Sequence, residues 1–239
     1  MQTIHLPGLP PVTDDPATLA PYLCTTPYFD YTHPAVEAFV REAIGDAQDP
    51  RERAVRLFYA VRDKIRYDPF RISYESPAYL TSNVVQAGYG WCVPKAGLLA
   101  ACARSVGIPS AIGLADVINH LNTEKLRARM GGSDLFYDHG YTALLIDGKW
   151  VKAVPAFNIE LCERFGVQPT EFDGRGDALY QEHDAHGRRH MQYLTEHGTW
   201  SDLPLQRVRD DMTKYYPGTE FAAGADAPEE RFEDGVPIR

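Results

Sequence analysis

The chain lacks the features by which nucleic-acid-binding and membrane-spanning proteins are recognised. Its 239 residues include 24 Lys and Arg against 33 Asp and Glu, and no run of basic residues stands out. A net charge of −9 argues against a nucleic-acid partner, because phosphate backbones attract cationic surfaces. No run of about 18 apolar residues is present, so no membrane span and no membrane partner are expected.

The first residues also lack the pattern of an export signal, and cysteine is scarce. Residues 1–16 contain no basic segment followed by an apolar stretch, which is how signal peptides are built. The cysteines, at Cys24, Cys92, Cys102 and Cys162, are widely separated. Without an export signal, scattered cysteines are expected to be free thiols rather than a disulfide framework. A cytoplasmic location is therefore expected.

Apolar residues are plentiful, at 44% of the chain, which is enough for a sizeable core. Helices are expected after His33-Pro34 and Asp49-Pro50, because proline suits the first helical turn, and a third begins near Cys92. Strands are expected over 110–117, 141–146 and 149–154, the last two joined by an Asp147-Gly148 hairpin turn. Helices followed by antiparallel strands indicate an α+β fold.

Composition divides the chain into three parts. Residues 1–30 are rich in proline and are expected to form an irregular N-terminal arm. Residues 31–158 hold the predicted helices and strands, with residues 67–90 expected to be loop-like and residues 119–138 expected to be a polar excursion between strands. Residues 159–239 are charged, and the aromatic residues spread through them indicate an extension that packs on the core. A partly flexible tail is the alternative.

Cys92 is the strongest candidate for a reactive side chain. It lies in Gly90-Trp91-Cys92-Val93-Pro94, where a glycine-rich turn gives way to a helix. A thiol there feels the positive end of the helix dipole and can lose its proton more easily. Its backbone N–H is also free to bind a developing oxyanion. A buried structural cysteine is the alternative. Trp91 is expected to wall a substrate cleft, or to be part of the core.

His139 is the candidate base, which a thiol nucleophile needs. It lies at the head of the strand expected over 141–146. If the strand over 110–117 pairs antiparallel with it and the sheet packs on the Cys92 helix, His139 can reach Cys92. A cysteine and a histidine placed in this way form the arrangement of thiol acyl-transfer enzymes.

The motifs that flank these two residues form a longer pattern. They are Gly90-Trp91-Cys92, Gly107-Ile108-Pro109, the His139 strand, and Trp150 with Pro155. Over about residues 50–158 this pattern resembles the transglutaminase-like superfamily, and the motifs at 117–120, 155–158 and 172–174 resemble a bacterial subgroup of it. The resemblance implies a papain-like core, with a cysteine-bearing helix packed on an antiparallel sheet. It also implies that Cys92 is the nucleophile and His139 the base.

One position departs from the pattern of that superfamily. Its members have an Asp four residues after the tryptophan, whereas Val154 follows Trp150 here. Valine can neither fix the tautomer of the imidazole nor stabilise its charged form. Asn158 is one candidate for the third catalytic role, since a Cys-His-Asn set works in papain-like proteases. Asp116 or Asn119, at the end of the neighbouring strand, is another, and a functional Cys–His dyad is the third.

Two other groups of polar residues allow a chemical interpretation. Gln86 or Asn83 could supply a second oxyanion donor, although ordinary loop roles are favoured for both. His183, His186 and His190 have spacings that suit one helix face and hence a metal ion. A glycine interrupts that helix, so a solvated histidine-rich stretch is favoured. No metal ion and no cofactor are expected.

These features together predict a cysteine-dependent acyl-transfer enzyme. The Cys92 thiolate would attack an amide or thioester carbonyl of a peptide or small molecule, with His139 moving the proton. Hydrolysis, as by a protease or amidase, is expected because water is always available and no amine pocket is evident. Amide formation with an amine is the alternative. A non-catalytic binding module, which Val154 favours, and a metal-dependent hydrolase using the histidines are the other classes.

Overall fold

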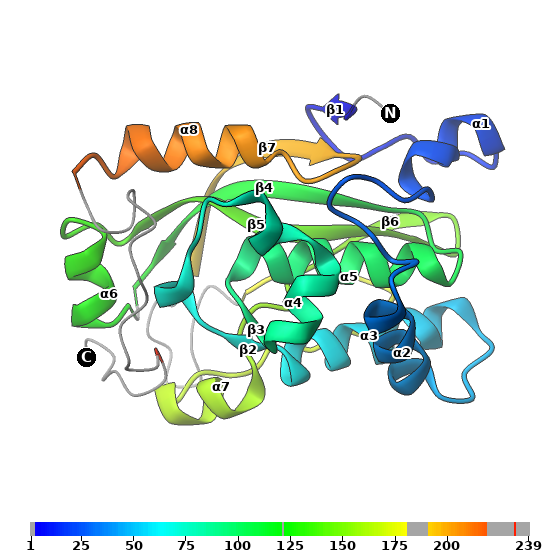
Figure 1. The fold of residues 1–239 in the computed structure, drawn as a ribbon, viewed down its shortest axis with the longest axis horizontal. Helices are drawn as coiled ribbons and strands as arrows, with labels where there is room; N and C mark the ends of the chain where they lie inside the picture. The colour runs from blue at the N-terminus through cyan, green and yellow to red at the C-terminus, as the bar shows by residue number, and fades with distance from the viewer. Residues whose placement is uncertain (1–2, 121, 181–190, 219–231, 233–239) are drawn as a thin grey trace.

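A five-stranded antiparallel sheet, in the order β1-β7-β4-β5-β6, forms the centre of the computed structural model (Figure 1). The structure describes residues 3–120, 122–180, 191–218 and 232. The strands of the sheet are β1 (His5–Leu6), β4 (Ser110–Asn119), β5 (Leu135–Ile146), β6 (Lys149–Ala153) and β7 (Met191–Trp200). A separate parallel pair joins β2 (Arg66–Tyr67) to β3 (Tyr89–Gly90).

The helix that carries Cys92, α5, packs against β4 and β5 and is surrounded by α2, α3 and α4 (Figure 1). The helices are α1 (Pro16–Leu19), α2 (Pro34–Ile44), α3 (Pro50–Lys64), α4 (Thr81–Ala87), α5 (Cys92–Ser105), α6 (Glu124–Arg129), α7 (Ile159–Phe165) and α8 (Leu205–Tyr215). Three 3₁₀ turns are η1 (Ala20–Tyr22), η2 (Pro69–Arg71) and η3 (Ser76–Tyr79). The expected α+β fold, with the cysteine helix on an antiparallel sheet, is confirmed.

The predicted helix starts and the predicted hairpin are confirmed by their local chemistry. The Asp49 carboxylate accepts the backbone N–H of Glu52 at 2.9 Å and so caps α3. Asp147 and Gly148 both have positive φ, at 49° and 75°, which is the conformation of a type I′ turn. The cap and the turn each depend on residues only a few positions apart, so both can be predicted from the sequence alone.

Three predicted boundaries were wrong. The strand β5 begins at Leu135 rather than near Tyr141, so His139 lies inside a strand and not at its head. The stretch 67–90 contains α4, which ends at Gly88 in the left-handed conformation. The stretch 119–138 contains α6, whose first turn is capped by the Thr123 hydroxyl. Each of these two helices has seven residues or fewer, too few for a clear hydrophobic period.

The sheet takes strands from all three parts of the chain. β7, from the C-terminal extension, pairs with β4, and β1, from the N-terminal arm, pairs with β7 at the edge. The extension therefore supplies an internal strand of the sheet. Within the described part of the chain, no helix combines the length and apolar character needed to cross a bilayer.

The helix α5 and the strand β5 touch through their backbones. A Cβ at Gly140 would lie 2.8 Å from the Cα of Val93 and 3.1 Å from the carbonyl oxygen of Cys92. The Thr142 hydroxyl adds a hydrogen bond of 2.8 Å to the carbonyl of Ala96. Only glycine allows an approach this close, and it places His139 beside the first residue of α5.

Replacement of Gly140 by alanine is expected to separate the sheet from α5. Because the clash is with backbone atoms, Gly140→Ala should lower the free energy of unfolding by about 1–3 kcal/mol. Gly176→Ala is the control, since a Cβ at Gly176 meets nothing within 4 Å. Urea unfolding measures both, and equal losses in the two variants would contradict the close contact.

Candidate active site

Cys92 and His139 line one small pocket, as the sequence predicted. Cys92 is the first residue of α5, and His139 comes from β5. The remaining lining residues are mostly aromatic or aliphatic: Tyr67, Pro69, Trp91, Phe136, Tyr137, Met212 and Tyr216. The pocket, called the Cys92 pocket below, has a volume of about 10 Å³, which is room for about one water molecule. The structure thus brings together the two residues needed for thiol chemistry.

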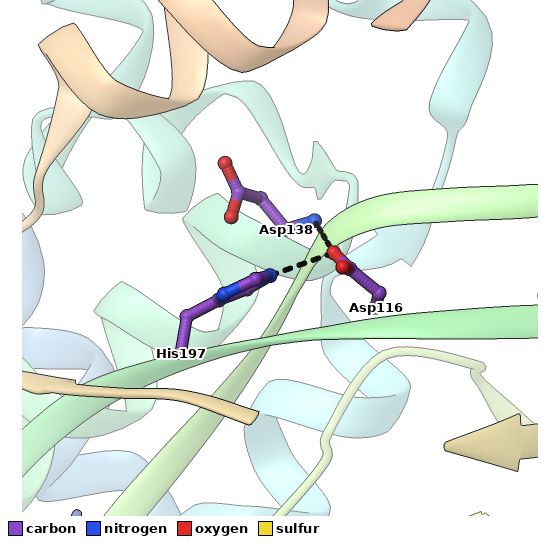
Figure 2. A group of neighbouring side chains, drawn as sticks. All are labelled: Asp116, Asp138 and His197. Atoms are coloured by element: carbon purple, nitrogen blue, oxygen red, sulfur yellow. Dashed lines mark hydrogen bonds and ion pairs between the residues drawn. The ribbon is translucent and has the colours of Figure 1, made fainter. Parts of the chain in front are cut away.

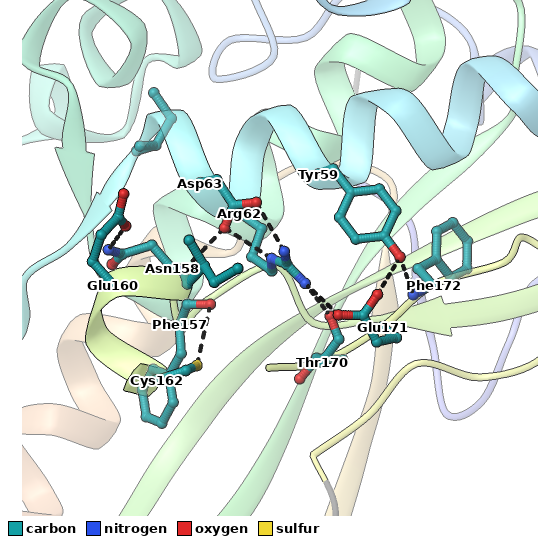
Figure 3. A network of polar contacts seen from close by, with 12 residues as sticks. Tyr59, Arg62, Asp63, Phe157, Asn158, Glu160, Cys162, Thr170, Glu171 and Phe172 are labelled. Carbon is teal, nitrogen blue, oxygen red and sulfur yellow. Dashed lines mark hydrogen bonds and ion pairs between the residues drawn. The ribbon is translucent and has the colours of Figure 1, made fainter. Parts of the chain in front are cut away.

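A buried lysine fixes the position of α5. Lys95 is fully buried, and its Nζ donates to the carbonyl oxygens of Arg62, at 2.9 Å, and of Ile65. These carbonyls belong to the C-terminal end of α3. The last carbonyls of a helix have no N–H donor within the helix and carry partial negative charge. Arg62 is held in turn by Asp63 and by the carbonyl of Thr170 (Figure 3). The first turn of α5 is therefore fastened to the end of α3.

The environment of the Cys92 thiol differs from the sequence-based expectation. Backbone N–H groups of Gly140, Val93 and Cys92 itself interact with the sulfur and favour the thiolate. However, Cys92 is only 3% exposed, and burial raises its pKa to about 12. The expected low pKa is wrong for this closed arrangement, because loss of hydration costs the thiolate more than the N–H groups return.

His139 is also buried in its uncharged form. The side chain is 2% exposed, and burial lowers its pKa to about 3. Neither ring nitrogen has a hydrogen-bond partner among the described residues. The ring packs edge-on against Tyr180, with a centroid separation of 5.4 Å. The closed site therefore holds a neutral thiol and a neutral imidazole rather than an ion pair.

Asn158 hydrogen-bonds to other groups than His139. Its Oδ1 accepts the backbone N–H of Tyr67 at 3.0 Å, and its Nδ2 donates to the carboxylate of Glu160 at 2.7 Å (Figure 3). The amide therefore connects β2 to the start of α7. The structure does not bring Asn158 into a hydrogen bond with His139, and its catalytic role stays a prediction.

Among the described residues, none of the other candidates for the third role hydrogen-bonds to an imidazole nitrogen of His139. Asp116 accepts hydrogen bonds from His197 and from the backbone of Asp138 (Figure 2). The backbone N–H of Asn119 donates to the carbonyl of Asp134, and Val154 is buried. Among the described residues, the site is thus a Cys–His pair without an acid on the histidine.

Trp91 separates the Cys92 pocket from a larger one. The second pocket has a volume of about 230 Å³ and is lined by residues that include Trp91, Arg71, Tyr79 and Asn83. The Asn83 amide donates to the carbonyl of Pro77 at 2.8 Å, whereas Gln86 is exposed on α4. Neither polar residue lines the Cys92 pocket, so the structure gives no support for a role at the oxyanion.

The C-terminal extension supplies walls of the site through two residues that sequence reasoning did not name. Met212 and Tyr216, at the end of α8, line the Cys92 pocket. The Tyr216 hydroxyl donates to the carbonyl of Leu135 at 2.7 Å and accepts the N–H of Tyr137 at 2.9 Å. The aromatic residues of the extension were the available signal, but nothing local in the sequence indicates which strand they contact.

One group of side chains has the composition of a metal site. Ligand atoms of Asp116, Asp138 and His197 all lie within 4.8 Å of one another. The guanidinium of Arg207 donates twice to Oδ1 of Asp138, at 3.2 Å, and Asp116 already accepts two N–H groups. These bonds favour an internally bonded network over a cation site. The histidine-rich stretch at 183–190 lies outside the described residues.

Removal of the Asn158 amide is expected to affect stability more than chemistry. Asn158→Ala leaves the buried N–H of Tyr67 without an acceptor, at a cost of about 1–3 kcal/mol of unfolding free energy, and Asn158→Asp restores the acceptor. The rate at which iodoacetamide alkylates Cys92, followed by peptide mass mapping, should fall far less than the roughly hundredfold expected for a lost base. A fall to the rate of a His139→Ala variant would establish Asn158 as the third catalytic residue.

Comparison with known proteins agrees with this geometry. Residues 37–155 match the family model of the transglutaminase-like superfamily, and the match includes both Cys92 and His139. The chain is similar to a proposed cysteine protease from Cytophaga hutchinsonii, at 13% identity and a TM-score of 0.46, over 82% of this chain and 60% of that chain. It is also similar to a proposed protease from Parabacteroides distasonis, at 19% identity and a TM-score of 0.36, over 60% of this chain and 26% of that chain.

The chain thus spans less than two thirds of the length of either solved structure. No curated protein matches it. The cysteine-bearing helix on an antiparallel sheet is the papain/transglutaminase-like architecture. The family model matches residues 37–155, and Cys92 and His139 within that region line one pocket. The chain therefore belongs to the transglutaminase-like superfamily.

Proposed function

We propose that this protein is a cysteine-dependent acyl-transfer enzyme that hydrolyses an amide or thioester bond of a peptide or small molecule. The observation that carries the proposal is the shared pocket of Cys92 and His139 at the N-terminus of α5. Membership of the transglutaminase-like superfamily supports a cysteine-dependent enzyme. The choice of hydrolysis rests on the general availability of water as an acceptor.

In the proposed reaction, His139 takes the proton from the Cys92 thiol as the sulfur attacks the carbonyl carbon. The oxyanion that develops is stabilised by the backbone N–H of Cys92 at the helix N-terminus. The bond to the leaving amine or thiol then breaks, and His139 returns the proton to that group. Water attacks the resulting thioester with His139 again as base, which releases a carboxylic acid and restores the thiol.

Substrate entry must change the Cys92 pocket, because the pocket holds about one water molecule. Met212 and Tyr216 of the α8 end are among its lining residues, and we propose that these side chains move to let a carbonyl reach the sulfur. Entry of a polar substrate also brings dipoles to a site where burial now disfavours both the thiolate and the imidazolium. The larger pocket on the other side of Trp91 is our proposed site for the rest of the substrate.

A second candidate function is amide formation with an amine acceptor. The Cys92 pocket is walled by aromatic and aliphatic side chains, and a site that excludes water protects a thioester from hydrolysis.

The reaction of the enzyme with p-nitrophenyl acetate in the presence of methylamine tests whether water or an amine is the acceptor. Mass spectrometry, after subtraction of the products formed with Cys92→Ala under the same conditions, is expected to find acetate as the main product, and a majority of N-methylacetamide would favour the amine acceptor.

Loss of either member of the pair should abolish thiol chemistry. Cys92→Ala is expected to release p-nitrophenol from p-nitrophenyl acetate at the background rate, and His139→Ala should be slower than the wild type by about a hundredfold. Cys102→Ala is the control, because Cys102 is also buried on α5 but does not line the pocket. Full activity of Cys92→Ala would refute the mechanism, and a wild type no faster than both variants would favour a non-catalytic binding module.

A further inference from the structure

The residue before His139 has a backbone conformation that strands rarely contain. Asp138 has a φ of 53°, and Asp147 is the other non-glycine residue with positive φ in the described chain. Asp147 lies in the hairpin turn, where a type I′ turn requires that conformation. Asp138 lies inside β5 and is fully buried. A non-glycine residue keeps a positive φ only when its surroundings hold it there.

The pairing of β4 with β5 shows where this conformation arises. Ala115 is opposite His139, whereas Val117 is opposite Phe136. Two residues of β5 therefore face Asp116 alone, which makes a β-bulge immediately before His139. A bulge of this kind redirects the side chain that follows it.

The strand on the other side of β4 bulges at the same level. Leu114 is opposite Gly198 and Ala115 is opposite Glu196, so His197 is an additional residue of β7, and a second shift between Asp116 and Val117 makes Leu194 another. β4 is therefore flanked by irregularities on both sides, and Asp116 lies between the two shifts on the β7 side.

The Asp116 carboxylate joins the bulge of β5 to the one at His197. Its Oδ1 accepts the backbone N–H of Asp138 at 3.2 Å and the Nε2 of His197 at 2.8 Å (Figure 2). The buried N–H of a bulged residue has lost its partner in the strand ladder and must find another. One side-chain oxygen supplies that partner for β5 and anchors the ring from β7.

A second contact holds Asp138 from α8. Arg207 donates through Nε and Nη2 to Oδ1 of Asp138, both at 3.2 Å. Asp116 thus holds the backbone of Asp138, and Arg207 holds its carboxylate. The segment that directs His139 is fixed on both sides, although no hydrogen bond reaches the imidazole itself among the described residues.

We propose that Asp116 is a positioning residue for His139, acting through the backbone of Asp138 at the β5 bulge. Asp116 would thereby replace part of the orienting role that the Asp at the position of Val154 has in the superfamily, without a hydrogen bond to the imidazole. The proposal rests on the proposed function, because it assumes that His139 is the base for Cys92. What matters is the place of an acceptor oxygen and not the negative charge.

Two substitutions of Asp116 separate the effect of the position of its acceptor oxygen from the effect of its negative charge. Asp116→Asn keeps an oxygen at the same distance from the backbone and removes the charge. Asp116→Glu keeps the charge but moves the oxygens outward by one methylene. A cation site, or an electrostatic effect on His139, needs the charge, so it predicts the opposite order of the two variants.

The test compares the rates at which iodoacetamide alkylates Cys92 in wild type, Asp116→Asn, Asp116→Glu and His139→Ala, measured across pH 6–9 by peptide mass mapping. Asp116→Asn should stay within about threefold of wild type with the same pH profile, and Asp116→Glu should fall at least about tenfold, toward His139→Ala. Thermal midpoints, with Asp202→Asn as the control for a buried carboxylate, show which variants are folded.

A wild-type rate for Asp116→Glu, or a rate for Asp116→Asn as low as that of His139→Ala, overturns the positioning role while His139 remains the base. Equal rates for wild type and His139→Ala overturn the proposed function and this proposal with it. If Asp116→Glu does not fold, the rate at which Cys92 is alkylated in Asp116→Asn decides. A rate near that of wild type supports the positioning role of the acceptor oxygen, and a rate near that of His139→Ala refutes it.

Discussion

The arrangement of the site depends on the backbone contact between Gly140 and the first turn of α5. A side chain at that position would meet the Cα of Val93 and the carbonyl of Cys92. Because β5 can approach so closely, the neighbouring His139 enters the same pocket as Cys92. Lys95 supports the contact from the other side, since it fastens the first turn of α5 to the last carbonyls of α3. The two reactive residues thus meet because two backbones are held together.

Burial determines the chemical state in which they meet. The same walls that exclude water raise the pKa of the Cys92 thiol to about 12 and lower that of His139 to about 3. Helix-terminal N–H groups alone do not make a thiol acidic when it is withdrawn from water. Burial in the closed structure therefore disfavours the thiolate, which is the reactive form of Cys92, and we expect its reactivity to rise when a polar group enters the pocket.

The parts of the structure that could be predicted are those coded by residues close together in the chain. The cap at Asp49, the Asp147-Gly148 turn and the glycine-rich entry to α5 each act over a few residues. The strand pattern indicated His139, and the family resemblance implied the same residue. The parts that could not be predicted depend on distant pairs. Asp116 and His197 are 81 positions apart, and the contact of Tyr216 with Leu135 joins residues equally far apart. No local pattern marks a β-bulge at Asp116 or the helix that closes the pocket.

The position of β7 in the sheet has a consequence for the order of synthesis. Residues 37–155, which carry Cys92 and His139, leave the ribosome before β7 and α8 exist. Until residues 191–216 emerge, β4 has an unpaired edge and the Cys92 pocket lacks the wall formed by Met212 and Tyr216. We expect the thiol of a nascent chain that ends before residue 191 to be more accessible than the thiol in this structure. The segment over 191–216 supplies part of the enclosure of Cys92.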